Sequence, residues 1–290
     1  MKKILAAMTS AAMLISMLGT VSAFADSSEN YIKNFTKIEM DAAPLKAAEE
    51  AMLPYQFDEL STQAQKCYTD IRKAILSHKN SVKLSSRISE KTLLTIADIL
   101  RNQDPLTFGG TEITYNGIST DNAYARLTYA YTKGVDESIA EQTAKEADKV
   151  IAAFAPNSDG YAKLLAVHDH ITATAEKDEN DPTMSFKTAY GPLVIGKGSS
   201  EGYARAFQYI CIKAGLTSVI VSGTDADGST HSWNKVKLGD EWYNVDCFAD
   251  DDGNRHDLFM VCDETMKQFY TEAGGKDIPA ANDKSYESNK

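Results

Sequence analysis

Three residues of this chain have the types that nucleophilic chemistry needs: Ser200, His231 and Asp246. Ser200 lies in Gly198-Ser199-Ser200-Glu201-Gly202, the G-x-S-x-G form of the turn that presents the serine of α/β-hydrolases. Those enzymes need a serine, an acid and a histidine in this chain order, which Ser200, Asp246 and His256 would supply. The first question is therefore which fold presents Ser200.

The surrounding sequence argues against the hydrolase turn. An α/β-hydrolase has repeated strand–helix alternation and an oxyanion loop ahead of its serine. The chain before Ser200 instead has mainly helical periodicity and no HGGG-like stretch. The short segment from Ser200 to His256 has the pattern of antiparallel hairpins. We therefore set the hydrolase interpretation aside.

A hairpin is predicted from strands 231–238 and 241–248, joined by Gly239-Asp240. This turn places Trp233 opposite Asp246 and His231 opposite Phe248, and alternate residues of a strand share a face. The shared face carries His231, Trp233, Asn244, Asp246 and Phe248. His231 and Asp246 are diagonal neighbours, about 7 to 8 Å apart at the backbone, so Asp246 could orient the imidazole.

A helix is predicted to begin near Ser200 and to end at Gly215. Its first turn has unpaired N–H groups and the positive end of the helix dipole, which favour a thiolate. A nucleophile at a helix start, followed by histidine and aspartate on adjacent strands, is the arrangement of cysteine-type acyl-transfer enzymes. In this chain the first of the three positions is a serine.

The run GKGSSEGYARAFQYICIKAGLTSVIVSG, followed by HSWNKVKLGDEWYNVDCFADD, resembles the bacterial transglutaminase-like domain. That family usually reads G-x-G-V-C-x-G-Y-A, then H-A-W-N-x-V and W-Y-x-V-D-x-T-W-D-D. The resemblance spans about residues 160 to 265. It implies an α+β fold with a papain-like transglutaminase core, in which the nucleophile helix packs on an antiparallel sheet, preceded by a mainly helical N-terminal region.

Position by position, the resemblance puts the family's Cys on Ser200, its His on His231 and its Asp on Asp246. The positions expected to line the substrate cleft are Tyr203, Trp233 and Asn244. The chain departs from the family at other site positions too, namely Ser199, Ser232 and Phe248-Ala249. Divergence at several positions indicates a natural, catalytically impaired or inactive homologue that binds peptide or cell-wall-type ligands.

Two alternatives stay open. A serine-dependent hydrolase or acyl transferase would use Ser200, His231 and Asp246 directly, with the hydroxyl giving its proton to a base as it attacks. A purely structural module would have an obstructed groove beside Ser200. Cys247 is not expected to replace the missing thiol, because its side chain should point away from Asp246 along the strand.

The first 25 residues read as a signal peptide: Lys2 and Lys3, an apolar run, and Ala23-Phe24-Ala25 before the cleavage point. The protein is therefore expected to be secreted after cleavage behind Ala25, with an uncleaved anchor as the alternative. The predicted domains are 26–155, a mainly helical region with a small β-hairpin; 156–274, the transglutaminase-like core; and 275–290, a flexible tail.

Cleavage would leave 28 basic against 41 acidic residues, which disfavours nucleic acid as a partner. No other segment is apolar enough to cross a membrane. No cofactor or metal site is predicted: His168 is expected on a buried helix face, His170 faces elsewhere, and the acidic turns do not fit an EF-hand loop.

Four cysteines are present in the chain: Cys67, Cys211, Cys247 and Cys262. Cys67 and Cys211 fall on apolar helix faces and are expected to be buried. A disulfide between Cys247 and Cys262 stays open, with packing in the core as its alternative.

Overall fold

The computed structural model describes residues 51–77, 81–106, 111–114, 118–119, 124–126, 128–131, 137–178, 184–253, 255–274 and 277–286. The expected signal peptide at 1–25 lies outside the described residues, as does the Asn116-Gly117 turn. The tail expected at 275–290 is described only over residues 277–286. Within the described ranges, no helix has the length and apolar character needed to cross a bilayer.

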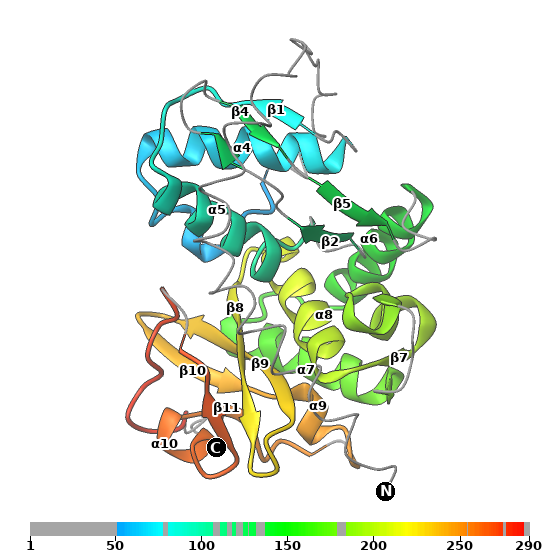
Figure 1. The fold of residues 1–290 in the computed structure, drawn as a ribbon. Helices are drawn as coiled ribbons and strands as arrows, with labels where there is room; N and C mark the ends of the chain where they lie inside the picture. The colour runs from blue at the N-terminus through cyan, green and yellow to red at the C-terminus, as the bar shows by residue number, and fades with distance from the viewer. Residues whose placement is uncertain are drawn as a thin grey trace, which may run out of the picture.

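A five-stranded antiparallel sheet forms the base of the molecule, in the order β11-β10-β9-β8-β12 (Figure 1). Its strands are β8 (Thr217–Asp225), β9 (Thr230–Leu238), β10 (Glu241–Val245), β11 (Phe259–Val261) and β12 (Tyr270–Glu272). The helix α8 (Ser200–Lys213) packs on β8 and β9, and α6 (Glu137–Ala152) and α7 (Gly160–Thr174) pack on α8. This is the predicted α+β class, a helix carrying Ser200 laid on an antiparallel sheet.

The register of the central hairpin agrees with the sequence pattern. Glu241 pairs with Leu238, and Gly239 adopts a φ of 64° in the turn between them. A two-residue turn of this kind needs a left-handed residue, which glycine adopts without a steric cost. The register predicted for this hairpin is therefore confirmed as far as Val245, which pairs with Asn234.

The prediction that the second strand runs to residue 248 is wrong. β10 ends at Val245, and Asp246 caps the short helix α9 (Cys247–Asp250). The Asp246 carboxylate accepts a hydrogen bond from the Ala249 backbone N–H at 3.0 Å. An aspartate that bonds to its own downstream backbone offers the chain an alternative to the strand ladder, and here that local bond prevails. Phe248 is consequently not a strand partner of His231.

The main core lies between α8 and the sheet. Phe207 and Ile210 of α8 are fully buried in this core, against Val236 of β9. Ala147 and Val150 of α6 join the same core, although α6 lies ahead of the boundary expected at 155. Gly215, with a φ of 76°, follows the end of α8, as predicted for a C-terminal glycine.

The N-terminal part is mainly helical and carries small antiparallel sheets above the main sheet in Figure 1. Its helices are α4 (Thr62–Leu76) and α5 (Glu90–Asn102), and its strands are β1 (Ser81–Lys83), β2 (Thr111–Thr114), β3 (Ile118–Ser119), β4 (Tyr124–Arg126) and β5 (Thr128–Tyr131). Gln103 joins this part to the main sheet: its side chain donates to the Ile220 carbonyl at 2.7 Å and accepts from the Ile220 N–H at 2.9 Å. The Gln103 side chain thus makes the two hydrogen bonds with the Ile220 backbone that a neighbouring strand would otherwise make.

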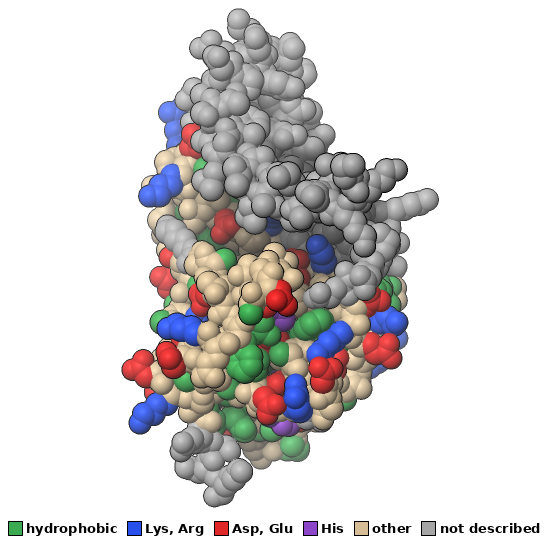
Figure 2. Space-filling model, turned by 60° about the horizontal axis from the view of Figure 1, so that its bottom comes forward, with side chains coloured by type: hydrophobic (Ala, Val, Ile, Leu, Met, Phe, Trp, Pro, Cys, Tyr) green, Lys and Arg blue, Asp and Glu red, His purple; other side chains and the backbone are tan. Residues whose placement is uncertain are grey.

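The remaining short elements are η2 (Tyr55–Phe57), β6 (Glu176–Lys177), η3 (Met184–Lys187), η4 (Gly191–Ile195), β7 (Lys197–Gly198) and α10 (Asp263–Met266). All four cysteines are buried free thiols, so the disulfide left open between Cys247 and Cys262 is not formed. On the face shown in Figure 2, acidic and basic side chains are interspersed around a central group of hydrophobic ones, and no patch of one sign dominates it.

Candidate functional site

Ser200 is the first residue of α8 and is buried, with 5% of its surface exposed. Ser199 ahead of it caps the helix, because its hydroxyl oxygen accepts the Gly202 N–H at 3.4 Å. The Ser199 N–H also donates to the Phe186 carbonyl at 3.0 Å. Ser199 differs from the valine usual at this position, and the structure gives it a definite structural task.

The two glycines of the G-x-S-x-G run serve close packing. A Cβ atom at Gly202 would lie 2.1 Å from the Phe186 carbonyl oxygen, and one at Gly198 would lie 2.6 Å from Cγ of Pro192. Both glycines therefore let η3 and η4 approach the start of α8. The hydrolase interpretation does not fit this fold, because the main sheet that follows Ser200 is antiparallel and the parallel pairing just ahead of Ser200 consists only of the two-residue strands β6 and β7.

His231 and Asp246 form a buried pair. His231 Nε2 lies 2.7 Å from Asp246 Oδ2, and the two residues are 8% and 1% exposed. The predicted contact is thus present, although Asp246 has left the strand. With Nε2 held by Asp246, Nδ1 is the ring nitrogen that can serve a nucleophile. The Ala249 N–H fixes the other carboxylate oxygen, so the pair is oriented from both ends.

Tyr270 is a member of this site that sequence analysis did not find. Its ring stacks on the His231 imidazole, with 4.2 Å between centroids and 14° between planes. Its hydroxyl hydrogen-bonds to Asp246, and burial, followed by the Asp246 charge and this bond, raises the pKa of Tyr270. Tyr270 therefore stays a neutral donor. No local pattern marks it, because β12 joins the sheet through long-range pairing with β8.

Replacing Tyr270 with phenylalanine should lower the free energy of unfolding by about 1 to 2 kcal/mol, since the carboxylate of Asp246 loses a donor while the ring stack remains. Tyr270→Ala should cost more, because the stack is lost as well. Urea denaturation measures both, with Tyr286→Phe, at an exposed ring, as the control. Equal stability of Tyr270→Phe and wild type would contradict a supporting bond to Asp246.

Trp233 and Asn244, expected to line a cleft, are joined within the sheet. The Trp233 indole N–H donates to Asn244 Oδ1 at 2.9 Å, and Asn244 Nδ2 donates to Asp263 at 2.9 Å. Asn244 is fully buried, so in this structure it fixes the Trp233 ring. That ring in turn stacks at 6.3 Å from the His231 imidazole. Their part in ligand binding stays a prediction.

Tyr203 links the start of α8 to the His231 pair through aromatic contacts. Its ring packs edge-on against Phe248 at 5.2 Å, and Phe248 lies 5.8 Å from the His231 ring. The Tyr203 hydroxyl donates to Asp251 at 2.9 Å. Burial, then this hydrogen bond, raises the pKa of Tyr203. Phe248 therefore lies between the rings of Tyr203 and His231.

A pocket of about 280 Å³ adjoins the same aromatic rings. Trp233 and Tyr270 form part of its wall, together with Lys267 and the acidic side chains of Asp263 and Glu272. The pocket thus combines two flat aromatic surfaces with charges of both signs. Such a lining suits a polar ligand with hydrogen-bonding groups.

Cys247 is not placed to act as a nucleophile. It is the first residue of α9 and is buried in the main core. Burial, followed by the negative charge of Asp246, raises the pKa of the Cys247 thiol well above its usual range. Because the thiolate is the reactive form of cysteine, this thiol is inert at neutral pH.

Residues 147–247 match the family model of the transglutaminase-like superfamily, and no curated protein matches the chain. Among solved structures, a TGase shares 14% identity over 61% of this chain and 52% of its own, with a TM-score of 0.37. A proposed cysteine protease from Cytophaga hutchinsonii shares 14% identity over 56% and 65%, with a TM-score of 0.35. A proposed protease from Parabacteroides distasonis shares 8% over 46% and 35%, with a TM-score of 0.29.

This chain spans less than two thirds of the length of each of these three proteins. The family match, by contrast, includes Ser200, His231 and Asp246, the helix start and the buried pair just described. Residues 147–247 of this chain are therefore similar to the transglutaminase-like superfamily.

Proposed function

We propose that this is an exported transglutaminase-like protein whose site binds peptide or cell-wall-type ligands without turning them over. The observation that carries the proposal is Ser200 at the start of α8 where the family has its cysteine, together with an oriented His231–Asp246 pair in the same domain. A cysteine is partly ionised at pH 7, whereas a serine hydroxyl must transfer its proton as it attacks. A site shaped for sulfur positions oxygen poorly, and an error of about 1 Å costs around 100-fold in rate.

The surroundings of Ser200 support ligand binding. The start of a helix carries partial positive charge on its N–H groups, which favours a carbonyl or carboxylate oxygen of a peptide. Trp233 and Tyr270, whose rings stack with His231, add flat aromatic surface at the wall of the pocket. The signal-peptide pattern of residues 1–25 supports export, where peptides and cell-wall fragments are available.

The rival function is a serine-dependent hydrolase. The observation in its favour is the intact His231–Asp246 pair, in which Asp246 holds Nε2 and leaves Nδ1 as the nitrogen that could act as a base. In that case Ser200 would form a covalent acyl intermediate with His231 as the base.

A fluorescent phosphonate probe separates the two functions. The proposal expects no covalent labelling of Ser200 in the wild-type protein at neutral pH, because the hydroxyl is poorly activated. Mass spectrometry of the peptide that contains Ser200 measures this, with Ser200→Ala as the unreactive control. Labelling of Ser200 that disappears in His231→Ala would instead establish the rival.

Two further measurements complete the test. Transamidase and protease activity of the wild type should stay at the level of Ser200→Ala; robust activity that Ser200→Ala abolishes would overturn the proposal. Calorimetric titration with purified muropeptides and with a casein digest should detect binding to the wild type. If neither mixture binds, the ligand-binding part of the proposal fails and a structural module is favoured.

A further inference from the structure

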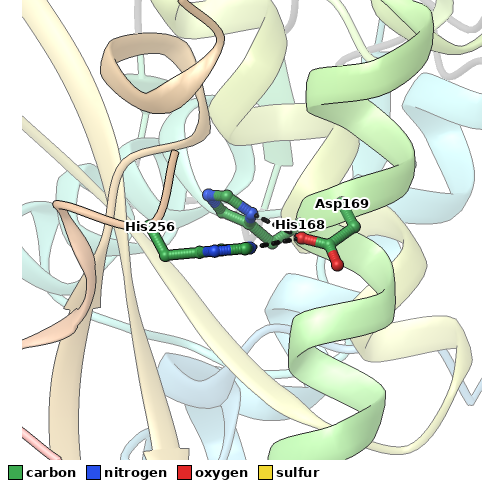
Figure 3. A group of neighbouring side chains, drawn as sticks. All are labelled: His168, Asp169 and His256. Atoms are coloured by element: carbon green, nitrogen blue, oxygen red, sulfur yellow. Dashed lines mark hydrogen bonds and ion pairs between the residues drawn. The ribbon is translucent and has the colours of Figure 1, made fainter. Parts of the chain in front are cut away.

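A second group of ionisable side chains lies apart from the Ser200 site. Helix α7 contributes the adjacent residues His168 and Asp169, and the segment between α9 and β11 contributes His256 (Figure 3). One potential ligand atom of each side chain lies within 4.8 Å of the other two. The group is invisible to local sequence analysis, because His256 follows Asp169 by 87 positions.

His168 is held in the orientation of a metal ligand. It is fully buried, and its Nε2 lies 3.2 Å from Oδ2 of Asp250, a residue that is 1% exposed. The Asp250 carboxylate also accepts the Leu258 N–H at 3.1 Å, which fixes its position. When Nε2 carries the proton toward Asp250, Nδ1 presents its lone pair to Asp169. A carboxylate behind the distal nitrogen of a histidine is the usual outer support of a metal-bound imidazole.

The other two side chains complete an accessible group of donors. Asp169 Oδ1 lies 3.3 Å from His168 Nδ1 and 2.6 Å from His256 Nε2. The Asp169 and His256 side chains are 41% and 44% exposed, so an ion and a bound water can reach them. Ligand atoms of a tetrahedral zinc ion lie about 3.3 Å apart. The separation between Asp169 and His168 already equals this value. The separation between Asp169 and His256 would have to lengthen by about 0.7 Å, through a shift of the exposed His256 ring.

The local charges also favour a cation. Both nitrogens of the buried His168 face carboxylates, Nδ1 toward Asp169 at 3.3 Å and Nε2 toward Asp250 at 3.2 Å. With an ion on Nδ1, His168 stays neutral, its Nε2–H donates to Asp250, and every polar atom of the ring is used. The ion would take the place of the direct contact between Asp169 and His256.

We propose that His168, Asp169 and His256 bind a divalent transition-metal ion, with water in the fourth position. Two imidazole nitrogens and one carboxylate oxygen suit Zn²⁺ and its neighbours far better than Mg²⁺ or Ca²⁺. The ion would tie α7 to the segment that leads into β11. It would also secure α9, whose last residue, Asp250, supports His168 and whose cap, Asp246, holds His231.

Titration of the metal-stripped full chain with Zn²⁺, followed by calorimetry and thermal unfolding, tests this site. The wild type should bind one Zn²⁺ and unfold at a higher temperature in its presence, whereas Mg²⁺ should have no effect. His256→Ala and Asp169→Asn should weaken Zn²⁺ binding at least tenfold, and Asp250→Asn by about 10- to 100-fold.

His170→Ala is the matched control, because His170 lies on α7 next to Asp169 but outside the group. It should bind Zn²⁺ with wild-type affinity. Because His256 is exposed, His256→Ala should fold normally. It therefore tests the site even if Asp250→Asn, a change at a buried residue, does not fold. The absence of Zn²⁺ binding by the wild type, or equal affinity of His256→Ala and the wild type, would overturn the proposal. Neither result depends on whether Ser200 reacts.

Discussion

Replacing Ser200 with cysteine should create a thiol that is alkylated by iodoacetamide at pH 6 far faster than the four native cysteines. The start of α8, together with His231 if it pairs with residue 200 as proposed, should lower the pKa of this thiol from about 8.5 into the range of about 3.5 to 7.5. If that pKa reaches about 6.5, the thiolate fraction at pH 6 rises by about 100-fold. The four native thiols are buried, which limits the access of the reagent. Burial opposes ionisation of Cys262, but its hydrogen bonds with Thr265 lower the pKa of that thiol, so Cys262 is the native cysteine to compare with residue 200. Mass spectrometry of the alkylated peptides over a pH series measures the rate at each position.

His231→Ala in the Ser200→Cys background is the control. Loss of the imidazole should return the alkylation rate to the pH dependence of an ordinary thiol, while α8 remains folded. Transamidation by Ser200→Cys should rise by about 100-fold over the wild type if only sulfur is missing. Identical alkylation with and without His231 would contradict the pairing of residue 200 with this histidine. Activation without turnover would indicate that the changes at Phe248 and Ser232 also impair catalysis.

Gly202→Ala should destabilise the protein by about 3 kcal/mol, the upper end of the usual cost of overpacking. Elsewhere inside a helix, the same change stabilises by about 0.5 to 1 kcal/mol, because alanine restricts the unfolded chain. Here the added Cβ would lie 2.1 Å from the Phe186 carbonyl, a backbone atom that cannot rotate away. The clash therefore outweighs the gain from restricting the unfolded chain, and the net change in the free energy of unfolding is a loss. The free energy of unfolding from urea denaturation measures it.

Gly160→Ala is the matched comparison, since Gly160 also stands in the first turn of a helix. Its added Cβ would meet only the end of the flexible Leu238 side chain, at 2.8 Å. We expect a change below about 1 kcal/mol. If Gly202→Ala is as stable as Gly160→Ala, the close approach of the Phe186 carbonyl in η3 to Gly202 of α8 is contradicted.

Local sequence signals located most of the site. Hydrophobic periodicity predicted a mainly helical chain ahead of Ser200, helix-end signals predicted α8, and the Gly239-Asp240 turn predicted the register of β9 with β10. These signals depend only on residues that are close together in the chain, so they can be recognised in a single sequence. The pattern failed at Asp246, where alternation alone could not show that a side-chain cap would end the strand.

Contacts between distant segments were beyond such signals. Tyr270 stacks on His231 through an edge strand that no alternation marked, and Gln103 joins α5 to β8 across more than a hundred residues. His256 meets Asp169 because the segment after α9 folds back over α7. Each of these partners is chosen by packing, which depends on the whole chain at once.

The sequence by itself determined the residue types of the site: a serine at a helix start, and a histidine and an aspartate on one hairpin. It could do so because helix starts and tight turns depend on neighbouring residues. Only the tertiary structure decided how these groups are held, with Asp246 in a helix cap, Tyr270 over His231, and glycines at 198 and 202 against η3 and η4. Those arrangements result from the exclusion of water and of overlapping atoms in a packed interior, which no single stretch of the chain encodes.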